Sequence, residues 1–144
     1  MFHRDYLMRI IQQVIEAIAK MMGLIEEGRS DLALKEAERG YGLLDVPKEL
    51  LDIASSETLA EVLGRPDKMR LCARLLAAEA SAYAASRDPL TAVKKRRTAL
   101  ELLLEAHREE PRDEDYDRIR ELARQVPTSS LAAKYRDTDG LASS

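Results

Sequence analysis

The side chains that most often carry chemistry in enzymes are scarce in this sequence, which has one cysteine and two histidines among 144 residues. Cys72 is expected on the inner face of an alanine-rich helix, where a thiol acts as a small hydrophobic group rather than as an exposed nucleophile. His107 falls on an apolar stripe near a helix end, and no second histidine lies four residues away, so a histidine-based metal site is not expected. The sequence therefore predicts a non-enzymatic protein with no catalytic residue, no metal ligand and no cofactor.

A basic run at residues 94–97 is the main candidate for contact with phosphate groups. Four consecutive helical residues point in all directions around the axis, so the run needs a neighbouring helix to complete a patch. That candidate patch consists of Arg70, Arg74, Lys94, Lys95 and Arg97. The alternative is a solvated helix face with local ion pairs such as Arg97 with Glu101. The net charge of -3 gives the protein no general attraction to nucleic acid. Nucleic-acid binding through this patch is therefore only the second hypothesis, after binding to a protein.

The composition favours a helical protein outside the membrane. Aromatic residues make up 4% of the chain, and alanine, leucine, glutamate, arginine and lysine, all good helix formers, dominate it. Charges interrupt every apolar stretch before it reaches the roughly 18–20 residues that span a bilayer, and the N-terminus lacks a signal-peptide pattern. A lone cysteine fits a reducing compartment. These features predict an all-α, cytoplasmic protein with no membrane partner.

Hydrophobic periodicity and helix breakers divide the chain into five main helices, near residues 4–27, 31–44, 67–86, 89–107 and 113–126. Two short helices are expected in the connector between Asp45 and Pro66. Ser30 is predicted to cap the second main helix, Ser55 or Ser56 the second short one, and Asp88 the helix that opens with Pro89. Residues 1–127 should form a single helical domain, and residues 128–144 a short helical turn and a flexible tail.

Two stretches about 59 positions apart share matching residues and the same expected order of helix, break and returning helix. The matches are Gly23-Leu24 with Ala82-Tyr83, Ala33-Leu34-Lys35 with Ala92-Val93-Lys94, and Leu43-Leu44 with Leu102-Leu103. Repeated helical units bury a continuous core by stacking on one another. The pattern predicts antiparallel helical hairpins packed as a bundle or short solenoid, with the alanine-rich helix at its centre.

The first helix is apolar over a wider arc than one neighbouring helix can cover. The residues that widen the arc form a candidate protein-interaction face, which consists of Leu7, Met8, Ile11, Ile15 and Met22. Methionine-rich surfaces adapt readily to partners. Two interpretations remain open: the protein's own helices cover this face, or it packs against a second copy or another protein.

Four short segments of the chain carry its similarity to other proteins. They are Met1-Phe2-x-Arg4-Asp5-Tyr6-x-Met8-Arg9, Gly23-Leu24-Ile25-Glu26-Glu27-Gly28, Ala33-Leu34-x-Glu36, and Leu75-Leu76-x-x-Glu79-Ala80 with Tyr83. Over about residues 2–126 the chain resembles a family of small, uncharacterised bacterial proteins with tetratricopeptide-like packing. The repeat is longer than the usual unit of about 34 residues, which weakens the expectation of a concave peptide-binding groove.

The resemblance implies no catalytic residues. Together with the helical repeat it predicts a scaffold or adaptor that binds a protein, or a homodimer formed through the first helix. A small ligand-binding bundle, with a polar pocket near His107, Tyr83 or Tyr116, is the third hypothesis.

Overall fold

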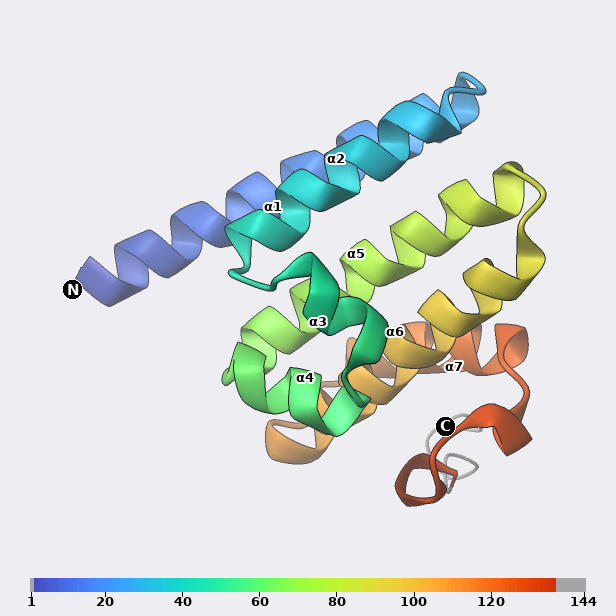
Figure 1. Ribbon diagram of the computed structural model, residues 1–144. Helices are drawn as coiled ribbons and strands as arrows, with labels where there is room; N and C mark the ends of the chain where they lie inside the picture. The colour runs from blue at the N-terminus through green and yellow to red at the C-terminus, as the bar shows by residue number, and fades with distance from the viewer. Residues whose placement is uncertain (1, 137–144) are drawn as a thin grey trace.

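Within the described part of the chain, the regular elements are all helices (Figure 1). The computed structural model describes the backbone of residues 2–136 and the side chains of residues 4–136. The elements are α1 (Phe2–Glu26), α2 (Ser30–Leu43), α3 (Lys48–Ile53), α4 (Ser56–Leu63), α5 (Pro66–Ala85), α6 (Pro89–Glu109), α7 (Asp115–Gln125) and two 3-10 turns, Thr128–Ser130 and Ala133–Tyr135. The predicted all-α class is confirmed, and α3 and α4 are the two short helices expected in the connector.

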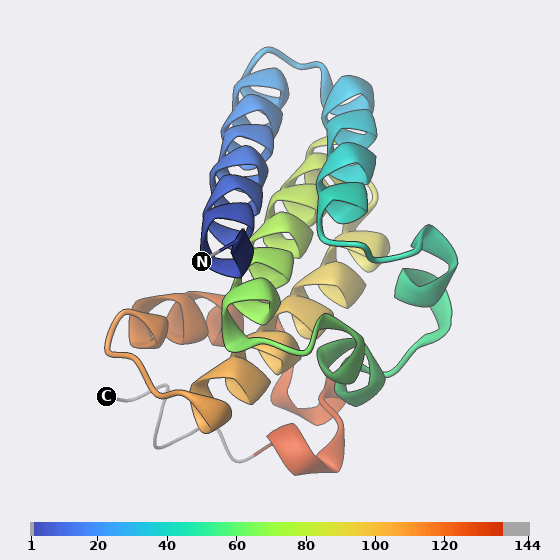
Figure 2. The ribbon, with the colours of Figure 1, turned by 90° about the vertical axis from the view of Figure 1, so that its left-hand side faces the viewer.

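Two long hairpins, α1 with α2 and α5 with α6, form most of the molecule (Figures 1 and 2). In each turn the residue before the second helix donates its amide to a carbonyl oxygen near the end of the first: Arg29 to Leu24 at 2.8 Å, and Asp88 to Tyr83 at 2.9 Å. The residue before each donor has a positive φ, 76° at Gly28 and 64° at Arg87. The two turns therefore reverse the chain in the same way, about 59 positions apart.

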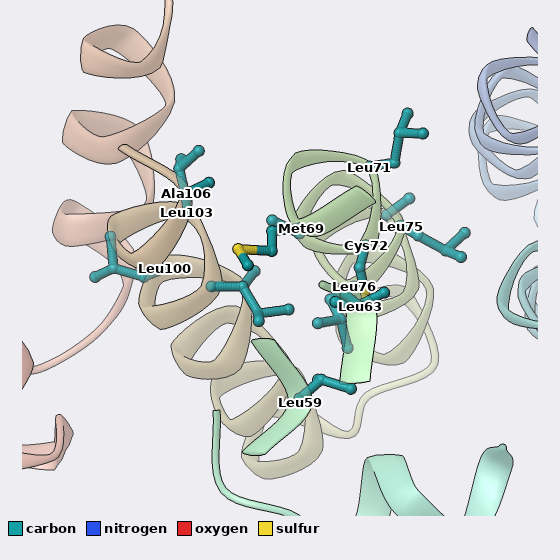
Figure 3. Close-up of a cluster of buried hydrophobic side chains, with 14 of the residues drawn as sticks. Leu59, Leu63, Met69, Leu71, Cys72, Leu75, Leu76, Leu100, Leu103 and Ala106 are labelled. Atoms are coloured by element: carbon teal, nitrogen blue, oxygen red, sulfur yellow. The ribbon is translucent and has the colours of Figure 1, made fainter. Parts of the chain in front are cut away.

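Helix α5 lies at the centre of the packing and contacts α1, α2, α4 and α6. Its alanine-rich surface lets these neighbours approach closely. Figure 3 shows part of the core, where α4, α5 and α6 meet. The buried side chains there include Leu59, Leu63, Met69, Cys72, Leu76, Leu100 and Leu103. Burying one leucine contributes about 1.5–3 kcal/mol, so this cluster is a major source of stability.

The helix starts follow the sequence prediction with one exception. Ser55 caps α4 by accepting a hydrogen bond from the Thr58 amide at 3.1 Å, and Asp88 caps α6 by accepting one from the Thr91 amide at 3.3 Å. Ser30, however, is the first residue of α2 rather than its cap. The backbone bonds of the hairpin turn place Arg29 at the capping position, and no side chain bonds there.

A buried polar chain joins three helices. The Tyr41 hydroxyl of α2 donates to Glu79 Oε1 of α5 at 2.6 Å, and Lys95 Nζ of α6 lies 3.4 Å from the same oxygen. Burial, followed by the charge of Glu79, raises the pKa of Tyr41 well above its usual value, so this phenol stays a neutral donor. Buried polar groups with satisfied partners favour one relative placement of the helices.

The packing continues past the boundary expected at residue 127, through two 3-10 turns in the segment where the sequence predicts a short helical turn. Leu131 and Tyr135 are buried and belong to the hydrophobic core. Glu101 of α6 accepts one hydrogen bond from the Ser56 hydroxyl at 2.6 Å and another from the Ala132 amide at 2.9 Å. Residues 128–136 are therefore part of the packed domain. Residues 137–144 of the predicted tail lie outside the described residues.

Candidate functional site

A buried ion cluster joins α5, α6 and α7. Arg70 of α5 binds Asp115 of α7 through two parallel hydrogen bonds, Nε to Oδ1 at 2.9 Å and Nη2 to Oδ2 at 2.8 Å. His107 of α6 places Nδ1 2.8 Å from Asp115 Oδ2. The Arg70 guanidinium also donates to the backbone carbonyl oxygen of Glu110. This arrangement gives Asp115, which is 2% exposed, donors on both carboxylate oxygens.

The electrostatics of the cluster favour an ionised Asp115. Burial alone would raise the pKa of this carboxyl group, but hydrogen bonds from Arg70 and His107 and their charges outweigh burial and lower it below its usual value. Asp115 is also the first residue of α7, where the helix dipole favours a negative charge.

His107 is a buried residue in the last turn of α6, close to the position that its sequence context predicts. The edge of its ring meets Tyr116, with ring centroids 5.0 Å apart. An aspartate that orients a histidine can support general-base chemistry when a nucleophile lies next to the ring. Among the described residues, no hydroxyl or thiol hydrogen-bonds to His107. The contacts that it does make connect α6 to α7.

Beside this cluster lies a pocket of about 710 Å³, lined mainly by α5 and α7, with two residues each from α1 and α6. Figure 2 shows α1 and α7 on the same side of α5. Ala73, Ala77 and Ser81, which are small residues at four-residue spacing on α5, form its floor. Ile11 and Ile15 of α1 provide an apolar wall. We call this site the α1–α5–α7 pocket; its size is typical of ligand or side-chain binding sites.

The α1–α5–α7 pocket is lined by five carboxylates and five arginines. Every one of the carboxylates has an ion-pair partner: Asp67 and Glu114 pair with Arg112, Asp115 with Arg70, Asp117 with Arg120, and Glu121 with Arg124. Arg74, Arg96 and Arg118 lie within 4.0 Å of no carboxylate in the described part of the chain. The lining therefore carries an excess of unpaired positive charge.

Arg74 lies in the middle of α5 and is half-buried. Burial, followed by the charge of Arg118, lowers its pKa below the usual arginine value. The guanidinium group stays charged, because an arginine pKa lies far above neutrality. No carboxylate of the described residues lies within 4.0 Å of Arg74, so an incoming anion would find this cation without a partner.

The basic patch predicted from the sequence is not assembled. Arg70 is buried in the ion pair with Asp115, and Lys95 is held by Glu79. Lys94 and Arg97 do not line the pocket, and Glu101 bonds to Ser56 and Ala132 instead of Arg97. Of the five predicted residues, Arg74 alone is an unpaired cation of the pocket lining.

Sequence reasoning missed Arg118 and did not single out Arg96 among the five patch residues, yet both line the same pocket. Arg96 belongs to the recognised basic run, and the one-residue difference from Arg97 changes its direction by about 100° around the helix. Arg118 lies on the last amphipathic helix, and its approach to Arg74 depends on how α7 packs.

The predicted interaction face of α1 is split between pocket and surface. Ile11 and Ile15 line the pocket, whereas Leu7 is half-buried. Met8 lies seven residues before Ile15 on α1, and Met22 lies seven residues after it. A shift of seven residues changes the direction of a side chain around the helix axis by only about 20°, so both methionines lie on nearly the same face as Ile15. Met8 is 61% exposed and Met22 is 41% exposed. They therefore extend the apolar wall in both directions along α1.

Cys72 is fully buried, and burial raises the pKa of its thiol to about 12. In the part of the chain that the structure describes, no group of three or more histidine, cysteine or carboxylate side chains is placed to hold a metal ion. None of the described helices is long and apolar enough to cross a membrane.

Comparisons with known protein families, with curated protein sequences and with solved structures find no match to this chain. The resemblance to a bacterial tetratricopeptide-like family therefore remains a prediction.

Proposed function

We propose that this protein is a non-enzymatic helical scaffold or adaptor that binds a protein partner in the α1–α5–α7 pocket. The observation that carries the proposal is the partly exposed apolar wall of α1, where Ile15 is 40% exposed, next to a pocket with a floor of small residues. Contiguous exposed apolar surface on a folded domain commonly marks an interaction site. Met8 and Met22 would extend the contact beyond the pocket itself.

We further propose that the hairpins α1–α2 and α5–α6 are two copies of one tetratricopeptide-like unit. Their turns share the same backbone hydrogen bonds and positive-φ position, which supports this view. In that arrangement the first helix of each unit, α1 and α5, lines the binding side. The second helices pack against them, and α6 also adds Arg96 and Leu103 to the pocket lining.

The partner in this proposal is another protein or a second copy of this chain. A photo-crosslinking amino acid at position 15 tests it inside cells, because Ile15 lies in the pocket wall. The matched control is the same substitution at Val62, a branched apolar residue of α4 that is 48% exposed and does not line the pocket.

We expect a discrete covalent adduct from position 15 and none from position 62, with its mass measured by mass spectrometry. An adduct of twice the chain mass would identify self-association through α1, and a larger or smaller increment would identify a different protein. Equal crosslinking from both positions, or none from either, would contradict docking in this pocket.

A further inference from the structure

The α1–α5–α7 pocket has an apolar side and a cationic side, which together restrict the chemistry of its occupant. Ile11 and Ile15 lie on α1, and Leu122 lies on α7. Arg74, Arg96 and Arg118 come from three different helices and meet at the same pocket. A ligand that satisfies both sides must carry carboxylate or phosphate groups on an otherwise apolar body.

We propose that the pocket binds an acidic amphipathic helix of a partner protein, whose carboxylates pair with Arg74, Arg96 and Arg118 and whose apolar side chains contact Ile11, Ile15 and Leu122. This inference rests on the proposed function, and it adds which kind of segment of the partner protein enters the pocket. The charge of the lining supports it, because the pocket's own carboxylates already have ion-pair partners and these three guanidinium groups have none.

The walls of the pocket favour a helical occupant over an extended one. Helices form the pocket, and the backbone groups of their interiors are hydrogen-bonded within each helix, so they offer no free edge to an extended peptide. A helix satisfies its own backbone and presents carboxylates and apolar side chains at three- and four-residue spacing. The small side chains of Ala73, Ala77 and Ser81 let such a helix approach α5 closely.

The apolar wall also separates this occupant from a nucleic acid. A strand held by phosphate contacts needs cations along its length. Here Arg70 and Lys95, which would extend the cationic surface, are engaged by Asp115 and Glu79. The remaining arginines share the pocket lining with Ile11, Ile15 and Leu122, and Arg74 is half-buried. Guanidinium groups in such settings pair well with carboxylates, often through two hydrogen bonds.

Selection from a displayed peptide library tests this inference on the purified chain. The library encodes helical peptides of about 16 residues with glutamate and lysine equally frequent at the variable polar positions, so its mean charge is near zero. We expect the selected peptides to be acidic, with carboxylates three or four residues apart and leucine or isoleucine on the adjoining face. Their binding should weaken as salt is added.

Two triple variants test whether peptide binding depends on the pocket arginines or on the overall positive charge of the protein. R74Q/R96Q/R118Q removes the three unpaired pocket cations. R9Q/R87Q/R97Q removes the same charge from arginines that do not line the pocket. We expect the first variant to bind a selected peptide at least about tenfold more weakly, as measured by fluorescence anisotropy, and the second to bind within about threefold of the unmodified chain. Circular dichroism establishes that both variants are folded.

The outcomes separate this inference from the proposed function. Neutral or basic selected peptides that compete with crosslinking at position 15 would overturn the acidic partner and retain docking in the pocket. Acidic peptides that bind both triple variants equally would place the charge recognition elsewhere and overturn the inference. A library that yields no binder, alongside a protein adduct at position 15, would show that the pocket takes a partner of another kind.

Discussion

At the residue scale, Asp115 holds three helices through Arg70 and His107. Asp115→Asn removes the buried charge and leaves the Arg70 guanidinium with the half-exposed Glu110 carboxylate, 3.6 Å away, as its remaining counterion. Breaking a buried ion pair in this way costs about 3–5 kcal/mol. We expect a loss of that size in the free energy of unfolding at pH 7, measured by urea denaturation.

The same variant should change how stability depends on pH. The pKa of Asp115 is lower in the folded protein than in the unfolded chain, so its stabilising contribution is complete above the unfolded value of about 4. The contribution is lost as the pH falls below that value toward the folded pKa. Between pH 5 and pH 3 the stability of Asp115→Asn should therefore fall less than that of the unmodified protein.

Asp117→Asn is the matched control, two residues further along α7. Its side chain is 89% exposed and pairs with Arg120 on the surface. Such pairs contribute roughly 0–1 kcal/mol. A loss at Asp117 as large as that at Asp115 would show that the first turn of α7, and not the buried ion pair, accounts for the effect.

At the scale of single elements, alanine substitutions at two glycines of α2 distinguish the effect of close packing on stability from the effect of helix propensity. A Cβ atom at Gly40 would lie 2.7 Å from Leu75 Cδ2, and Leu75 is fully buried. Overpacking of this kind costs about 1–3 kcal/mol, which exceeds the roughly 1 kcal/mol that alanine contributes to a helix over glycine. We expect Gly40→Ala to lower the free energy of unfolding by about 1 kcal/mol.

Gly42→Ala is the control within the same helix. Gly42 is exposed, and a Cβ atom there would meet nothing within 4 Å. Alanine at this position should raise the free energy of unfolding by about 0.5 kcal/mol. If both variants were stabilised in thermal or urea unfolding, α2 would not be packed on Leu75 as closely as the structure places it.

The segment after α7 offers a second prediction about an element. Leu131 is 2% exposed and lies in the common core, although its sequence context of small and polar residues suggests a tail. Leu131→Ala should lower the free energy of unfolding by about 2–5 kcal/mol, measured by urea denaturation. Thr128→Ala, at an exposed position of the adjoining turn, should change it by less than about 0.5 kcal/mol. Equal effects would indicate that this segment does not dock.

The helices were predictable from the sequence because their signals are local. Periodic apolar residues and breakers such as Gly28 and Pro89 mark each long helix to within a few residues. The Arg70–Asp115 pair was not predictable, because its partners are 45 positions apart and meet only after α5 and α7 pack. The docking of Leu131 depends likewise on Glu101, whose carboxylate accepts the Ala132 amide from a distant helix.

In the candidate site, too, features within one helix could be predicted from the sequence, and contacts between helices could not. The apolar face of α1 could be predicted because its residues follow one helix, and Ile11 and Ile15 do line the pocket. Arg74 belongs to the predicted basic patch, but its meeting with Arg96 and Arg118 at one pocket could not be predicted, since the three arginines come from three helices. Their lack of partners depends on which carboxylates other arginines take up, and Asp117 and Glu121 each pair with an arginine three residues away.

At the scale of the whole molecule, the two hairpins share one core. The cluster of buried residues is continuous from Ile10 of α1 to Tyr135, and α5 contacts both α1 and α2 of the first hairpin. Neither hairpin has a separate core of its own to keep it folded. We therefore expect unfolding in urea to be a single cooperative transition, with no state in which one hairpin alone persists.

Hydrogen exchange measured by mass spectrometry near the urea midpoint tests this expectation. Peptides from α1 and from α6 should lose protection together, with the same apparent free energy of opening, and far-UV circular dichroism should give the same midpoint. Helical repeats that are coupled only weakly unfold in steps instead. Earlier exchange throughout α1 and α2, at a lower urea concentration than in α6, would show that the contacts of α5 with the first hairpin are too weak to couple them. In that case the wall and floor of the α1–α5–α7 pocket would belong to separately stable units, and the pocket would not be preformed when a partner arrives.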